Sequence, residues 1–136
     1  MRVMMMVKGD QEPGEIPSEK LLAAMGSYNE ELAKAGVLLD LAGLHPSAEG
    51  VRVRLSGGKT TVVGGPFADR REIVAGYWLL QVRSMDEAIE WAKRLPVEAA
   101  EHDYGQESEI EIRQVFELEE FAEGPAIDRA GGLEEE

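Results

Sequence analysis

The apolar run at the start of the chain constrains the fold most. Residues 3–7 read Val-Met-Met-Met-Val, with no polar residue at alternate positions. A strand with one wet face alternates apolar and polar side chains, whereas an unbroken apolar run is typical of a strand covered on both faces. We therefore predict that residues 3–7 form a central strand. The run is too short for a membrane span or a secretion signal, so we expect a cytoplasmic protein that makes no membrane contact.

Two later segments have the apolar spacing of amphipathic helices. The stripe of the first helix consists of Leu21, Met25, Tyr28 and Leu32. Ser18 precedes this stripe as an N-cap, and Gly36 follows it as a helix terminator. The second helix is expected to begin at the capping box of Ser84 and Glu87 and to end before Pro96.

Strand-like segments occupy much of the remaining chain, at residues 37–44, 51–55, 59–63, 76–82 and 109–116. Gly57-Gly58 predicts a tight hairpin between two of them. The order β-α-β, hairpin, β-α-β predicts an α+β fold, a ferredoxin-like protomer with an extra β-hairpin. Two helices cover only one face of such a sheet. Burial of residues 3–7 on both faces therefore requires a second copy packed sheet against sheet, and we expect a homodimer.

Composition disfavours several classes of function. The formal net charge of -13 repels phosphate backbones, so we expect no nucleic-acid partner. The chain has no cysteine, and its two histidines, His45 and His102, are far apart in sequence, so we expect no metal and no other cofactor. Much of the negative charge lies near the end of the chain. We divide the sequence into a domain at residues 1–116 and an acidic, partly disordered tail at residues 117–136.

Five sequence patches occur in the order found in one known family. They are Gly43-Leu44-His45-Pro46-Ser47, Gly64-Gly65-Pro66-Phe67-Ala68-Asp69 with Arg71-Glu72, Gly76-Tyr77-Trp78, Glu87-Ala88-Ile89-Glu90-Trp91-Ala92 and Glu109-Ile110-Glu111-Ile112-Arg113. Through these patches, residues 1–121 resemble the YCII-related, or DGPF-domain, proteins. The resemblance implies a dimeric α+β barrel with a cavity between sheet and helices. It does not fix an activity, because the superfamily includes isomerases, lyases, cofactor-free monooxygenases and binding proteins.

Three positions depart from the pattern of that family. Gly64 stands where the family has an aspartate before Gly-Pro-Phe, and Ala42 stands where close relatives have an acid. Met25 occupies the place of the histidine that the resemblance implies in the first helix. No acid–base histidine can therefore be carried over onto this sequence.

Asp40 and His45 are the candidate catalytic residues. Asp40 interrupts an apolar segment, where a carboxyl with a raised pKa could serve as a general base; the alternative is a solvated edge-strand residue. His45 ends the same segment, where it could transfer a proton at a cavity mouth or hold a turn. Residues five apart in a regular strand point to opposite faces, so a dyad would need a bulge, for which Gly43 is the candidate.

Four aromatic residues are the candidate ligand contacts, with core packing as the alternative for each: Tyr28, Phe67, Tyr77 and Trp78. We therefore expect a YCII-like dimer that binds a small organic molecule between sheet and helices. If it is an enzyme, we expect cofactor-free proton transfer of the isomerase or lyase type. The alternative is a non-catalytic protein-interaction or structural module, in which the dimer surface and the acidic tail bind a protein partner.

Overall fold

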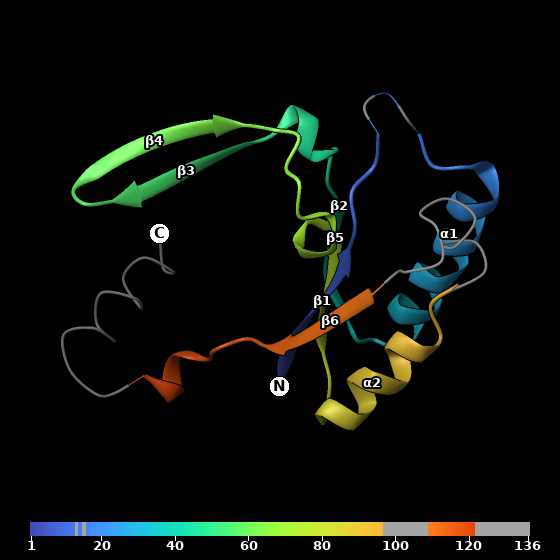
Figure 1. Cartoon of the computed structure of the whole chain (residues 1–136). Coiled ribbons are helices and arrows are strands. Elements are labelled where there is room, and N and C mark those ends of the chain that lie inside the picture. Colours follow the sequence, from blue (N-terminus) through green and yellow to red (C-terminus); the bar gives the residue numbers. More distant parts are fainter. Residues whose placement is uncertain (13, 15, 97–108, 122–136) are drawn as a thin grey trace.

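The computed structural model describes residues 1–12, 14, 16–96 and 109–121 and has two layers, a four-stranded sheet and two helices on one of its faces (Figure 1). The sheet contains β1 (Arg2–Lys8), β2 (Leu38–Gly43), β5 (Val74–Gln81) and β6 (Glu109–Gln114) in the order β2-β5-β1-β6. All neighbouring strands are antiparallel. This arrangement confirms the predicted α+β, ferredoxin-like fold.

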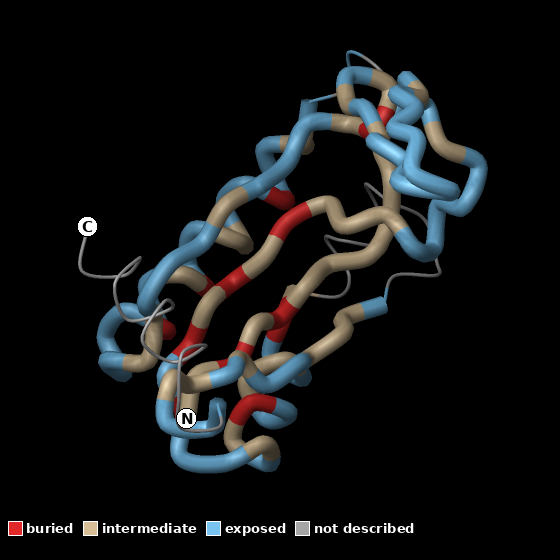
Figure 2. The backbone as a smooth tube through the Cα atoms, turned by 90° about the vertical axis from the view of Figure 1, so that its left-hand side faces the viewer, coloured by how far each residue is buried: buried red, intermediate tan, exposed pale blue. Residues whose placement is uncertain are grey.

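Strand β1 is central, as its apolar run predicted, and lies between β5 and β6. Val3 and Met5 are fully buried beneath the helices, whereas Met4 and Met6 lie on the opposite face and are partly exposed. Figure 2 shows this opposite face of the sheet toward the viewer. The described part of the chain places no helix over it.

Both helices begin at the predicted caps. In α1 (Glu19–Lys34), the Ser18 hydroxyl accepts a hydrogen bond of 3.1 Å from the backbone N–H of Leu21. In α2 (Met85–Lys93), the Ser84 hydroxyl accepts one of 3.2 Å from the N–H of Glu87. Each bond satisfies a helix N–H that has no partner within its own helix. The caps therefore fix where each helix starts against the sheet.

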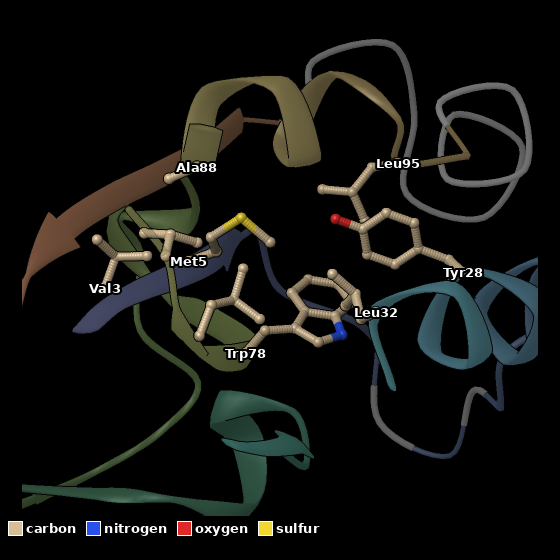
Figure 3. Close-up of a cluster of buried hydrophobic side chains, with 9 residues drawn as sticks. Val3, Met5, Tyr28, Leu32, Trp78, Ala88 and Leu95 are labelled. Atoms are coloured by element: carbon tan, nitrogen blue, oxygen red, sulfur yellow. The ribbon is translucent and has the colours of Figure 1, made fainter. Parts of the chain in front are cut away.

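The core lies between the helices and β1 and β5 (Figure 3). Its fully buried side chains are Val3, Met5, Leu32 and Leu80. Burying each of them contributes about 1.5–3 kcal/mol. Tyr28 packs edge to face against Trp78, with ring centroids 5.6 Å apart. This contact locks α1 onto the sheet near the C-terminal half of the helix.

The predicted hairpin is present as β3 (Val51–Ser56) and β4 (Lys59–Gly64), which among the described strands pair only with each other. Gly57 and Gly58 have φ values of 57° and 76°, which favour glycine and form the two-residue turn. Figure 1 shows the hairpin extending from the domain on the side of the sheet that carries no helix.

The Gly64 to Phe67 turn is held by Ser47, the one buried polar side chain of the described residues. The Ser47 hydroxyl accepts a hydrogen bond of 3.1 Å from the N–H of Phe67 and donates to Asp10. The N–H of Ser47 also donates to Asp10, at 2.8 Å. Three loops therefore meet at the Ser47 hydroxyl, and the turn serves as a structural corner.

The described residues of the acidic tail begin with Glu117, whose carboxylate forms two hydrogen bonds with the Arg2 guanidinium, at 3.0 and 3.2 Å. Phe116 and Phe121 pack with ring centroids 5.3 Å apart around a 3-10 turn at Leu118–Glu120. The remainder of the tail, from residue 122, lies outside the described residues, as does His102. The predicted disorder of the tail stays a prediction.

Candidate functional site

An apolar cleft of about 250 Å³ lies between the N-terminal half of α1 and the sheet strands β2 and β5. Helix α1 supplies Leu21, Leu22 and Met25 to its wall, and the sheet supplies Leu41 and Trp78. Its floor includes Gly43 and Gly76, which face each other across β2 and β5. A Cβ atom at Gly43 would meet nothing within 4 Å, so the space beside this residue is open.

The walls of the cleft expose aliphatic side chains to water. Leu22 is 57% exposed and Leu41 is 39% exposed. Large aliphatic groups left in water inside a concave surface are a common mark of a binding site, because a ligand that covers them gains hydrophobic free energy.

One amide group in the cleft has a defined orientation. The indole N–H of Trp78 donates a hydrogen bond of 2.8 Å to Oδ1 of Asn29. Because an indole N–H is only a donor, the oxygen of the amide must face Trp78 and the NH₂ group must point elsewhere. No described residue accepts a hydrogen bond from this NH₂ group, and Asn29 is part of the cleft lining. Asn29 therefore brings an amide of fixed orientation to a lining that is otherwise largely apolar.

Tyr28, predicted as a ligand contact, belongs to the core. It is 4% exposed, and its hydroxyl donates a hydrogen bond of 2.7 Å to the carbonyl oxygen of Trp91. Burial raises the pKa of Tyr28 well above its ordinary value. Among the other predicted contacts, Trp78 and Tyr77 border the cleft, but the Tyr77 side chain points to the other face of the sheet, where its hydroxyl donates to Asp40.

Phe67 lies in the corner loop and is not part of the lining of the cleft. The Arg52 guanidinium sits 3.9 Å from the centre of its ring, a cation–π contact at the base of the hairpin. Arg52 also binds Asp69 through two hydrogen bonds of 3.1 and 3.2 Å, which lower the pKa of the Asp69 carboxyl. Phe67 therefore joins the hairpin to the domain.

Asp40 faces away from the cleft. Leu41 and Trp78 are register partners and both line the cleft, so Asp40, the strand neighbour of Leu41, points to the other face of the sheet. There its carboxylate accepts a hydrogen bond of 3.1 Å from the Tyr77 hydroxyl. This hydrogen bond raises the pKa of Tyr77.

The structure does not bring Asp40 and His45 together. The His45 side chain is 85% exposed, and its Nδ1 lies 3.1 Å from a carboxylate oxygen of Glu49. The bulge that a dyad would require at Gly43 is absent, since the register shift of β2 lies between Leu38 and Asp40. Each candidate catalytic residue instead has a local partner of its own.

Sequence reasoning missed Leu22, Asn29 and Leu41. A signal was present for two of them, because Leu22, Met25 and Asn29 recur at spacings of 3 and 4 along one side of the predicted stripe. For Leu41, the alternation of Asp40 and Leu41 separated two faces of one strand, but the face that borders the cleft depends on the packing of α1.

Two positions of the cleft carry the departures from the family pattern noted above. Met25 and Ala42 both belong to its lining. They are the positions at which the resemblance implies a histidine and an acid. In this chain Met25 places a thioether in the cleft wall. Ala42 borders the cleft, but its methyl group lies on the same face of β2 as Asp40, because both residues are strand neighbours of Leu41.

Within the described ranges, no group of three or more histidine, aspartate or glutamate side chains is arranged to hold a metal ion. No helix among the same residues is long and apolar enough to cross a membrane.

Comparison with known proteins gives two matches. The family model of the YCII-related domain matches residues 1–119 of this chain. An uncharacterized protein of Rhizobium meliloti (strain 1021) is 32% identical over 77 residues, which cover 57% of this chain and 62% of the relative. The match therefore spans less than two thirds of the length of that relative.

Proposed function

Because the chain belongs to the YCII-related family, we propose that the cleft between α1 and the sheet is its functional site and binds a small, largely apolar organic molecule. The observation that carries the proposal is the combination of exposed aliphatic walls with the oriented NH₂ group of Asn29. Binding sites for small molecules typically join an apolar lining to a few fixed polar groups in this way.

The polar group defines the chemistry of the ligand. Asn29 presents N–H donors, so the ligand should carry an acceptor such as a carbonyl or carboxylate oxygen. The volume of about 250 Å³ suits a compact body about the size of two fused rings. A small aromatic or branched aliphatic acid or ketone fits both requirements.

Binding is favoured over proton transfer within the cleft. A general acid or base must reach the proton that it transfers, directly or through one water molecule. Met25 and Ala42 cannot transfer protons, and Asp40 points to the other face of the sheet. The function that the geometry supports best is therefore ligand binding without turnover in the cleft.

The uncovered face of the sheet supports the expected homodimer. Met4, Met6, Tyr77 and Leu79 lie on this face and are partly exposed. A second copy packed against this face would remove these side chains from water. Leu79→Asp should then shift the chain to a monomer in sedimentation equilibrium. A wild-type chain that is monomeric at tens of micromolar would refute the pairing.

Ligand binding can be tested with 2-naphthoate, a two-ring carboxylate. In a Trp91→Phe variant, Trp78 is the single tryptophan of the chain, so its fluorescence reports occupancy of the cleft. We expect saturable quenching that Leu22→Asp weakens at least tenfold. Ala23→Asp is the matched control, because Ala23 is exposed on the same helix and is not part of the lining. Equal affinity of Leu22→Asp and Ala23→Asp for 2-naphthoate would refute the proposal.

A further inference from the structure

The β3–β4 hairpin has one apolar face with no partner among the described residues. Cross-strand register places Val53 opposite Val62, with Val51 and Leu55 on the same face. These four side chains are 57–78% exposed. The other face carries Arg52, whose contacts with Phe67 and Asp69 attach the hairpin to the domain.

A two-stranded hairpin by itself is marginally stable in water. Its four exposed aliphatic side chains would gain free energy by packing on another surface. The hairpin extends from the domain on the side of the uncovered sheet face (Figure 1). A second copy that approaches this sheet face would therefore come within reach of the hairpin.

The net charge of the hairpin differs in sign from that of the rest of the chain. Residues 51–64 contain Arg52, Arg54 and Lys59 and no acid, so the hairpin carries a charge of +3. The rest of the chain contains all 27 acids and the remaining 11 basic residues, a net charge of -16. Register places all three basic side chains on the face opposite to the apolar one. The apolar face can therefore make the contact, while net charge attracts the arm to a second copy of this acidic chain at long range.

We propose that the β3–β4 hairpin is an arm that lays its Val51, Val53, Leu55 and Val62 face on the body of a second copy of this chain. The arm shares its partner with the proposed sheet pairing but uses a different surface. In a symmetric dimer, each copy would give one arm and receive one.

The test exchanges valine for threonine, which keeps the shape and the strand preference but replaces a methyl with a hydroxyl group. We expect Val53→Thr/Val62→Thr to raise the dimer dissociation constant at least tenfold in sedimentation equilibrium. Val63→Thr, on the other face of the hairpin, is the matched control and should change it less than threefold. Far-UV circular dichroism checks that each variant is folded.

Comparison with Leu79→Asp separates the two contacts. If the double variant Val53→Thr/Val62→Thr leaves the dimer dissociation constant unchanged while Leu79→Asp raises it, the sheet pairing is supported and the arm is refuted. If only Val53→Thr/Val62→Thr raises the dissociation constant, the arm is supported and the sheet pairing is refuted. A chain that stays monomeric and whose hairpin face binds anionic phospholipid vesicles would assign the face to a membrane and overturn the proposal.

A second measurement does not depend on the threonine variants. The chain has no cysteine, so Ser56→Cys provides one labelling site at the tip of the hairpin. With a benzophenone maleimide on this cysteine, irradiation should yield a covalent dimer joined from the hairpin of one copy to the body of the other. Absence of that product from a sample that sediments as a dimer would contradict the arm.

Discussion

Replacement of Gly65 by alanine should destabilise the domain by roughly 3–5 kcal/mol. A Cβ atom at Gly65 would lie 1.7 Å from the backbone oxygen of Ser47 and 2.6 Å from its carbonyl carbon. Both neighbours are backbone atoms, so the two loops must separate by more than an ångström. Overpacking of this kind costs about 1–3 kcal/mol. Separation also strains the hydrogen bonds that Ser47 makes with Asp10 and Phe67, each worth about 1 kcal/mol.

Gly64 provides a matched control one residue away. A Cβ atom at Gly64 meets nothing within 4 Å, and its φ is not positive. Alanine there should be neutral or should stabilise the strand by about 0.5–1 kcal/mol. Urea unfolding, followed by tryptophan fluorescence, measures both effects. The change in the free energy of unfolding is the shift in midpoint urea concentration multiplied by an m-value shared by the variants. If the two variants differed by less than 1 kcal/mol, the corner formed by Ser47 would not hold the loops as described.

Three further predictions concern the corner and the cleft. Burial alone would raise the pKa of Asp10, but hydrogen bonds from the Ser47 side chain and backbone outweigh burial and lower the pKa below its ordinary value of 3.8. The stability that Asp10 contributes is then present above pH 3.8 and lost as pH falls through the folded-state pKa, so the unfolding free energies of wild type and Asp10→Asn should converge in acid. Asp40→Asn and His45→Ala should each change the 2-naphthoate dissociation constant less than threefold in fluorescence titration, because neither side chain lies in the cleft; a tenfold loss would place one of them there. Met25→His should weaken binding of 2-naphthoate at least fivefold by the same titration, since the change introduces a polar group into an apolar wall, and unchanged binding would count against this location of the site.

The elements of the fold could be predicted because their signals are local. The non-alternating run of β1, the caps at Ser18 and Ser84 and the turn at Gly57-Gly58 each depend on a few neighbouring residues. The predicted strand boundaries were less accurate than the predicted elements. The predicted strand 76–82 begins at Val74 in the structure, because pairing with β1 continues past Gly76 to the bulge at Lys8.

The cleft could not be predicted from local patterns, because it arises from packing between distant segments. Asn29 acquires its orientation from Trp78, which is 49 residues away. Tyr28 and Trp78 both looked suitable for a cavity, yet the way α1 packs on the sheet buries the tyrosine and leaves part of the tryptophan in the lining. The bulge before Asp40 likewise depends on pairing with β5.

The central claim, that Asn29 donates to a ligand in the cleft, is tested most directly by Asn29→Asp. Aspartate still accepts the hydrogen bond from Trp78, so the wall is preserved, but the two N–H donors are replaced by a carboxylate oxygen. Titration of the Trp91→Phe background with 2-naphthoate and 2-naphthamide measures the consequence. We expect Asn29→Asp to weaken the affinity for 2-naphthoate at least tenfold. The affinity for 2-naphthamide should be retained, because its NH₂ group can donate to the aspartate. Equal affinity of wild type and Asn29→Asp for 2-naphthoate would contradict the account.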